Sequence, residues 1–422
     1  MLQAAAVAPV KGAEILVVGG GMVGSACALA LQHAGARVTL VDPGDPRARA
    51  SFGNAGQICI DHCEPAANLA NVWSGAGRLF AFGGPLDFRA RDWDLWAPWT
   101  AEYLRACLPG RFRSGTAATA ALQARSIPAW RTLLHLAGRP DLLEPVGYFG
   151  LWENEAAARF GTAALQRSDL GPATVRPVTP QELTRLREVF AGRPAGGVLF
   201  DNSAKLRDPG GTVEALQAAF AAAGGVLLQG RVARLETAGR TSAVLDSGER
   251  LSPQRIVVCG GVRSRSLMRD LGVRAPLIAE RGYHLHFAEH RWPADVAPAL
   301  FQDRWVLATR FDTGVRLTSF TELARPDTPP DPRKWAALRR HAEALGVPVE
   351  GEGEEWMGAR PTLPDFLPAI GRVAGRPEVL YAFGHQHVGV TLAAATAEAV
   401  LELAGAETTP PRLGAFDLQR FR

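Results

Sequence analysis

The pattern of apolar and polar positions near the start of the chain predicts a strand, a helix and a second strand. Residues 14–18 are apolar and β-branched, residues 22–34 are rich in alanine and leucine, and residues 37–41 are β-branched again. Three consecutive glycines separate the first stretch from the second, and Gly35 follows the second. Such a β-α-β unit is the usual beginning of a parallel sheet.

The rest of the chain alternates between helical and extended patterns. Helices are expected through most of 66–140 and at 181–190, 209–223, 335–345 and 388–403. Strands are expected at 146–153, 226–229, 231–236, 242–246, 255–259 and 379–383, and at several places in 277–322. Loops are expected at 43–57, 326–333 and 360–375. Asp208 and Pro209 form a good helix start.

The elements that suit a dinucleotide fold stand at the front, middle and end of the chain, which favours two interleaved domains. We predict an α/β cofactor domain of residues 1–75, 195–275 and 355–422. An α+β, sheet-based substrate domain would contain residues 76–194 and 276–354.

Composition narrows the function classes. Hydrophobic residues are 47% and charged residues 21% of the chain, as in ordinary globular proteins. The net charge is +4, but no block of like charges occurs, which disfavours a nucleic-acid partner. Five cysteines without a C-x-x-C pair argue against a disulfide framework and for a reducing compartment.

The apolar stretch 15–31 is short for a transmembrane segment. We therefore expect a cytoplasmic protein, or one at the periphery of the inner membrane.

The three glycines begin a G-x-G-x-x-G motif, Gly19-Gly20-Gly21-Met22-Val23-Gly24, placed between the predicted strand and helix. Gly19 permits the tight turn, Gly21 leaves room for a pyrophosphate, and Gly24 lets helix and strand pack closely. Asp42 ends the second strand, where a carboxylate accepts hydrogen bonds from a ribose. The motif predicts dinucleotide binding; the alternative is a turn with a structural role only.

Four further stretches resemble D-amino-acid dehydrogenases and their relatives, in the same order along the chain. They are Ser51-Phe52-Gly53-Asn54-Ala55-Gly56-Gln57, Glu280-Arg281-Gly282-Tyr283-His284, Arg360-Pro361-Thr362-Leu363-Pro364-Asp365 with Pro368-Ala369-Ile370-Gly371, and Gly384-His385-Gln386-His387-Val388-Gly389-Val390-Thr391. The stretches 128–134 and 208–225 are similar to the D-hydroxyproline dehydrogenase branch. Val262-Arg263 and Ala204-Lys205 depart from the family pattern, which leaves the exact substrate open.

This resemblance implies the D-amino-acid oxidase fold and non-covalently bound FAD. The residues expected at the cofactor are Gly19, Gly21, Met22, Val23, Gly24, Asp42, Ser51, Asn54, Gly56, Gln57, Val232, Gly260, Gly384, His385, Val388, Gly389, Val390 and Thr391. Asn54 is alternatively a turn residue. His385 either lines the flavin or bonds the backbone.

Arg360, Tyr283 and His387 are the expected catalytic residues. A guanidinium is a planar, bidentate partner for a carboxylate, so Arg360 is predicted to hold the substrate, although an interdomain salt bridge is the alternative. Arg310 and Arg316 are rivals for that role. Tyr283 either offers its hydroxyl to the substrate or fills the core, and His387, like His385, either lines the flavin or bonds the backbone.

The implied reaction is oxidation of a D-amino acid or a cyclic secondary amine, such as D-proline or hydroxy-D-proline, by hydride transfer from Cα to flavin N5. The lone pair of the neutral amine drives the transfer, so no enzyme base is strictly required. A sarcosine or glycine oxidase-like activity, an NAD-dependent dehydrogenase and a non-catalytic flavoprotein subunit are the alternatives. The electron acceptor, whether oxygen, a quinone, a dye or a partner subunit, stays open.

No metal is expected, because Asp61-His62-Cys63-Glu64 are consecutive and point to different sides. This segment is instead expected to shape the substrate pocket.

Overall fold

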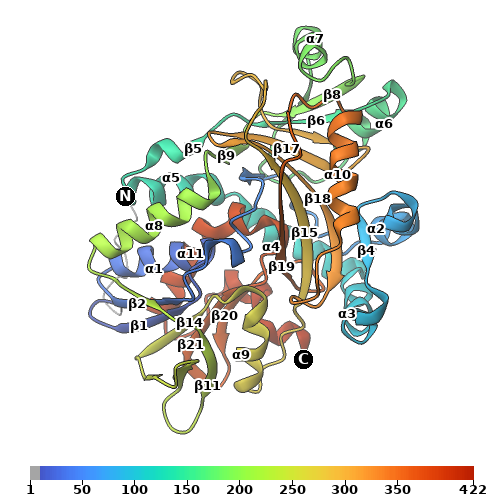
Figure 1. Ribbon diagram of the computed structural model, residues 1–422. Coiled ribbons are helices and arrows are strands. Elements are labelled where there is room, and N and C mark those ends of the chain that lie inside the picture. Colours follow the sequence, from blue (N-terminus) through green and yellow to red (C-terminus); the bar gives the residue numbers. More distant parts are fainter. Residues whose placement is uncertain (1–9) are drawn as a thin grey trace.

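The computed structural model describes residues 10–422, which form two large sheets surrounded by helices (Figure 1). The first sheet has six strands. Their order is β10 (Val226–Gln229), β2 (Arg37–Asp42), β1 (Glu14–Val18), β14 (Arg255–Val258), β21 (Arg376–Phe383) and β20 (Ala369–Val373). All neighbours are parallel except β20, which is antiparallel to β21. The predicted β-α-β unit is confirmed at its centre.

Both faces of the six-stranded sheet are buried. Ile15 and Val17 of β1 pack in one core with the helices α1 (Met22–His33), α8 (Pro209–Ala222) and α11 (Gly389–Gly405). Leu16 and Val18 pack in another core on the opposite face. That face is covered by β11 (Val232–Glu236), β12 (Ser242–Leu245), β13 (Arg250–Leu251) and α9 (Ser264–Asp270). A strand covered on both faces is apolar throughout instead of alternating, which explains the sequence of β1.

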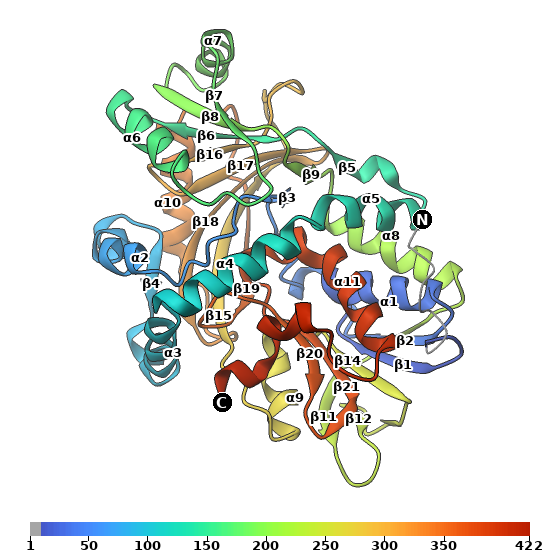
Figure 2. The ribbon, with the colours of Figure 1, turned by 180° about the vertical axis from the view of Figure 1, so that it is seen from behind.

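The second sheet has nine strands. Their order is β19 (Glu354–Thr362), β15 (Ile278–Phe287), β18 (Gly314–Ala324), β17 (Val306–Phe311), β16 (Ala299–Phe301), β6 (Tyr148–Trp152), β8 (Gly196–Phe200) and β7 (Val175–Pro177), and β4 (Leu86–Phe88) pairs with β18. The helix α10 (Pro332–Ala344) covers one face, and α11 lies toward the other (Figures 1 and 2).

The remaining elements surround these sheets. A small sheet joins β3 (Gln57–Ile58), β9 (Ala204–Leu206) and β5 (Leu143–Glu144). The other helices are α2 (Leu69–Ser74), α3 (Trp93–Ala106), α4 (Pro109–Gln123), α5 (Ser126–Leu136), α6 (Glu155–Leu165) and α7 (Pro180–Val189). Helices α4 and α5 contact α11 (Figure 2).

The prediction of a single loop over residues 360–375 is wrong. Residues 360–362 end strand β19, and β20 occupies Ala369–Val373. Pro361 made the segment read as a loop, but β19 is the edge strand of its sheet. A proline without an N–H is tolerated at an edge.

The predicted domain boundaries do not follow the sheets at two points. Strands β8 and β19, which the sequence assigned to the cofactor domain, pair within the nine-stranded sheet. Helix α5, assigned to the substrate domain, packs in the same core as α1 and α11. The division into two interleaved domains stays a prediction.

One helix is long and apolar enough to cross a membrane by length and composition. It is Gln386–Gly405, and 72% of its most apolar window is buried inside the protein. Packing against α1 and α5 accounts for this apolar sequence. The predicted cellular location stays a prediction.

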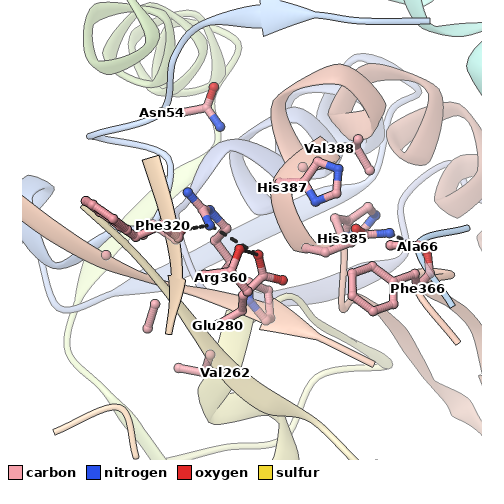
Figure 3. A pocket seen from close by; sticks show the side chains of 18 of the residues that line it. Asn54, Ala66, Val262, Glu280, Phe320, Arg360, Phe366, His385, His387 and Val388 are labelled. Atoms are coloured by element: carbon pink, nitrogen blue, oxygen red, sulfur yellow. Dashed lines mark hydrogen bonds and ion pairs between the residues drawn. The ribbon is translucent and has the colours of Figure 1, made fainter. Parts of the chain in front are cut away.

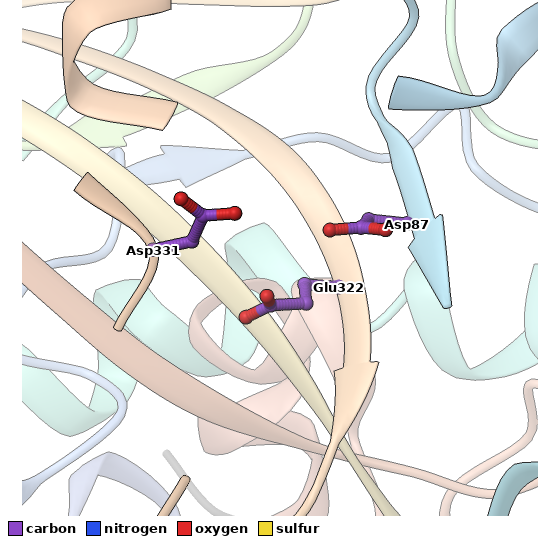
Figure 4. A group of neighbouring side chains, drawn as sticks. All are labelled: Asp87, Glu322 and Asp331. Carbon is purple, nitrogen blue, oxygen red and sulfur yellow. The ribbon is translucent and has the colours of Figure 1, made fainter. Parts of the chain in front are cut away.

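A buried ion cluster ties α10 to the nine-stranded sheet, and Figure 4 shows its three carboxylates. Oxygen atoms of Asp87, Glu322 and Asp331 lie within 4.8 Å of one another, a spacing that also suits metal ligands. The Lys334 ammonium, however, lies 2.6 Å, 3.1 Å and 3.5 Å from these three carboxylates. Arg281 Nε also donates to Glu322 at 2.6 Å. The cluster therefore supplies its own cations, and we interpret it as structural.

Replacing Lys334 with methionine is expected to lower the free energy of unfolding by about 3–5 kcal/mol, because it leaves buried carboxylates without their shared cation. Lys334 and Glu322 are fully buried, so water cannot compensate. Urea denaturation measures the change. Arg339→Met on the same helix removes a more exposed pair with Glu355 and is expected to cost about 1 kcal/mol or less. Equal effects of the two substitutions would contradict a structural role for the cluster.

Candidate active site

A cavity of about 850 Å³ opens between the glycine turn after β1 and the strands β15, β18 and β19. Cavities of this size accommodate large organic ligands. Gly19, Gly21, Met22 and Val23 line it, as predicted from the motif. Gly24 does not line the cavity, because it packs beneath the turn. A Cβ at this position would lie 1.8 Å from the Gly19 oxygen.

Asp42 holds the turn in shape. Its Oδ2 accepts a hydrogen bond from Gly20 N at 2.7 Å, and its Oδ1 accepts from Arg49 Nη2 at 2.8 Å. Asp42 is not among the cavity-lining residues, whereas Arg49 is. The ribose contact of Asp42 stays a prediction, and Arg49 is a cationic neighbour of the cavity that the sequence analysis missed.

The segment 48–57 brings polar atoms to the cavity that lack protein partners. Arg49 Nε, Ser51 Oγ and Gln57 Oε1 are buried without a hydrogen bond within the described residues. Buried polar atoms are normally satisfied. A ligand with phosphate, ribityl and ring-nitrogen groups would satisfy them, so the cavity fits a flavin dinucleotide.

Asn54 fits both of its predicted roles, whereas Gly56 differs from expectation. Asn54 lines the cavity, but its Oδ1 accepts from Gly56 N at 2.8 Å, as a turn residue does. Gly56 has φ +73°, and a Cβ there would lie 2.7 Å from the Phe311 ring. Gly56 is therefore needed for the turn and for packing, and it does not line the cavity.

The N-terminal end of α11 lies beside this segment and forms another part of the cavity wall, where Thr391 Oγ1 donates to the Gln57 oxygen at 3.3 Å. His385, Val388, Gly389, Val390 and Thr391 line the cavity, as expected, together with Gly260 from the turn after β14. No side chain caps α11, so its first N–H groups and the positive end of its dipole are available to a ligand.

Two further predicted cofactor residues lie elsewhere. Gly384 has φ +80° and packs against Leu363, and Val232 is buried in the core under the β11–β13 sheet. Neither lines the cavity within the described residues.

Arg360 and Glu280 meet at the cavity wall (Figure 3). Arg360 Nη1 donates to Glu280 Oε1 at 3.1 Å and to the Phe320 oxygen at 3.0 Å. Burial raises the pKa of Glu280, but Arg360, His387 and bonds from Thr362 and Thr321 outweigh it and hold the pKa below its usual value. Glu280 is therefore a carboxylate, and it fixes one edge of the guanidinium. Arg360 Nη2 and Nε have no hydrogen-bond partner in residues 10–422.

The model of the family described as "FAD dependent oxidoreductase" matches residues 14–403. The chain belongs to this family. The match confirms FAD as the cofactor, as well as the resemblance stated from the motifs, and it decides against the NAD-dependent and non-catalytic alternatives.

Curated relatives extend over almost the whole chain. A D-amino-acid oxidase of Bradyrhizobium diazoefficiens is 29% identical over 97% of this chain and 99% of that protein. A D-amino acid dehydrogenase of Dechloromonas aromatica is 30% identical over 94% of this chain and 98% of that protein.

Solved structures confirm the fold class. Glycine oxidase from Geobacillus kaustophilus superposes with a TM-score of 0.72 at 18% identity, covering 97% of this chain and 99% of that one. Iminodiacetate oxidase from Chelativorans sp. BNC1 gives a TM-score of 0.69 at 18% identity, covering 96% and 98%.

In this FAD-dependent oxidoreductase the Tyr283 hydroxyl points away from the cavity. It donates to Glu322 Oε2 at 2.7 Å and accepts from Asp331 N at 3.0 Å, inside the buried ion cluster. Arg281 and Tyr283 are two residues apart in β15, so the alternation of a strand directs both side chains to the same face and into this cluster. Of the two alternatives for Tyr283, the structure favours the core.

Two histidines that line the cavity contact each other. The rings of His62 and His387 contact edge to face, with centroids 5.4 Å apart. His387 is exposed to the open space of the cavity, although protein atoms surround its ring. Burial, followed by the neighbouring His62, lowers the pKa of His387 to about 4. His385 is packed away, 2.9 Å from Thr396 Oγ1, and burial lowers its pKa to about 3. Both rings are neutral at physiological pH.

The predicted rivals of Arg360 do not reach the cavity. Arg316 Nη1 donates to the Phe52 and Asn54 oxygens at 3.2 Å and 2.6 Å, and neither Arg316 nor Arg310 lines the cavity.

The Asp61–Glu64 segment contributes one residue, His62, to the cavity lining. His62 Nε2 lies 3.6 Å from Asp61 Oδ2.

Strained backbone gathers at the site. Five non-glycine residues among those described have positive φ, and four of them, Trp305, Phe320, Phe366 and Gln386, line the cavity. Such conformations cost about 1–3 kcal/mol each and cluster where function requires them. This signal was not readable from the sequence.

Proposed function

We propose that the protein oxidises the CH–NH bond of a D-amino acid or a cyclic secondary amine. The observation that carries this proposal is the guanidinium of Arg360, which lines the same cavity as the N-terminal end of α11 and bonds protein through Nη1 only. The full-length likeness to enzymes named for D-amino acids supports the class of substrate.

In this proposal Arg360 binds the substrate carboxylate with Nη2 and Nε, and Glu280 keeps the guanidinium in its plane. Gly282 is required beside it: a Cβ there would lie 2.0 Å from Arg360 Nη2. The neutral His387 can accept a hydrogen bond from the substrate amine, which reacts in its unprotonated form with its lone pair free. Trp99, Phe320 and Phe366 line the cavity with apolar surface and exclude water.

Bound FAD would supply the acceptor for the hydride that leaves Cα with its two electrons. The substrate becomes an imine, which water hydrolyses to a keto acid and ammonia when the amine is primary. The glycine turn, the 48–57 segment and the N-terminal end of α11 are the proposed cofactor contacts, with Arg49 added to those expected from sequence.

Anaerobic mixing of the FAD-loaded protein with D-amino acids and D-proline is expected to bleach the flavin absorbance, and the L-enantiomers are expected to do so far more slowly. Sarcosine and glycine in the same panel test the smaller-amine alternative. Repetition in air with peroxide detection separates oxygen from other electron acceptors. If neither an amino acid nor a cyclic amine bleaches the flavin, the proposed function is wrong.

A further inference from the structure

One of the arginines that line the cavity, Arg78, has no anionic partner within the described residues. Arg78 ends the 3₁₀ turn Ala76–Arg78, is half-buried and lines the same cavity as Arg360. Its Nη1 donates to Asn71 Oδ1 at 2.8 Å, and its guanidinium lies over the Trp305 ring, 4.2 Å from the centroid. Within residues 10–422 no carboxylate forms an ion pair with it.

The other arginines that line the cavity differ in this respect. Arg49 pairs with Asp42, Arg263 with Asp327 and Arg360 with Glu280, as the structure shows. Burial lowers the pKa of Arg78, because a charged group is disfavoured when it leaves water. A half-buried cation without a counterion is uncommon, and an anionic ligand would compensate it.

A short run of β18 connects Arg78 with the substrate-binding arginine. Arg360 Nη1 bonds the Phe320 oxygen at 3.0 Å, and the adjacent Ser319 Oγ donates to the Trp305 oxygen at 2.8 Å. Trp305 is the ring on which Arg78 rests. Both Trp305 and Phe320 have positive φ, 55° and 70°, so the connection is held in a strained conformation.

A second polar group that lines the cavity also lacks a partner. Thr318 Oγ1, next to Ser319, is buried without a hydrogen bond within the described part of the chain, and Thr318 lines the cavity. A hydroxyl donor and a free guanidinium are the groups that recognise a carboxylate.

We propose that Arg78 binds a second anionic group of the substrate, so that the preferred amines carry two carboxylates, one for each arginine. D-aspartate, D-glutamate and secondary amines such as iminodiacetate have this chemistry. The inference rests on the proposed function, since Arg360 takes the carboxylate next to the reacting carbon. Arg78 then distinguishes acidic from neutral side chains of equal size.

Matched pairs of amines test the proposal in the FAD-loaded enzyme. The rate of anaerobic flavin reduction is expected to be higher for D-aspartate than D-asparagine, for D-glutamate than D-glutamine, and for iminodiacetate than sarcosine. In Arg78→Met the preferred acidic substrate is expected to lose about 30-fold or more in kcat/KM, while its neutral counterpart changes little. Arg78→Glu is expected to favour D-lysine. Arg111→Met, which removes an exposed arginine outside the cavity, controls for net charge.

A titration that needs no turnover provides the second readout. Glutarate and succinate are expected to perturb the flavin absorbance at lower concentrations than butyrate, and Arg78→Met is expected to abolish that difference. Equal reduction by acidic and neutral amines, or equal loss for both in Arg78→Met, would overturn the role of Arg78 while leaving the proposed function intact. If no amine reduces the flavin, the proposed function fails, and the titration still decides whether Arg78 selects dianions.

Discussion

Arg360→Met is expected to lower kcat/KM for D-amino acids by roughly 10²–10³-fold while the protein keeps its FAD. The substitution removes the bidentate partner of the substrate carboxylate and leaves Glu280, which is 3% exposed, without its cation. Loss of one member of a buried, hydrogen-bonded charge pair costs about 2–5 kcal/mol. Stopped-flow reduction of the bound flavin measures the effect, and the flavin-to-protein ratio reports cofactor retention.

Two further variants separate binding from positioning. Arg360→Lys keeps the charge but not the planar fork, so it is expected to recover only part of the activity. Gly282→Ala keeps Arg360 but forces its guanidinium to move, since the new Cβ would lie 2.0 Å from Nη2. Its loss of kcat/KM is expected to approach 10²-fold, as for a misplacement of about 1 Å. If Arg360→Met retains full kcat/KM, another residue holds the carboxylate, and Arg78 becomes the candidate.

The cofactor end of the site was predictable because its residues are close in sequence. The glycine turn joins β1 to α1 directly, and both strand and helix carry unambiguous patterns. The segment before α11 was equally readable as a strand, a turn and a helix. Local spacing fixes such geometry, so most of the expected residues there line the cavity.

The substrate end was less predictable because it depends on pairing between distant strands. Glu280 and Arg360 are opposite each other in β15 and β19, 80 residues apart, and neither strand shows this pairing in its sequence. The extra residue of the bulge opposite Gly282 lies in β18, at Phe320 and Thr321, and simple alternation cannot anticipate such an irregularity. Arg78 is brought to Trp305 by the packing of a helical segment on the sheet.

Several glycines of the family motifs have a packing role that sequence alone attributes to the cofactor. Gly24, Gly56 and Gly384 do not line the cavity, and each is held by a close backbone or side-chain neighbour. A glycine required for close packing and one required for close approach of a ligand look identical in a motif. Only the position of the missing Cβ separates the two roles.

Gly24→Ala is accordingly expected to abolish stable FAD binding and to destabilise the protein itself. The added Cβ would lie 1.8 Å from the Gly19 oxygen and 3.2 Å from Cys259 Cβ. The first neighbour is backbone, so no rotamer change relieves the clash, and α1 must move away from β1. Overpacking of this kind costs about 1–3 kcal/mol, and the stabilisation by bound FAD is lost in addition.

Gly21→Ala provides the matched control, because its Cβ would meet nothing closer than Ser51 Oγ at 3.9 Å and would project toward the cavity. This variant is expected to lose FAD affinity while the thermal midpoint of the apoprotein stays near that of the parent apoprotein. Gly24→Ala is expected to lower both quantities. Flavin content after gel filtration and thermal melts of the apoproteins measure them. Stoichiometric FAD and an unchanged melt in Gly24→Ala would show that α1 can shift freely, and the tight junction of β1 and α1 would then not position the cofactor.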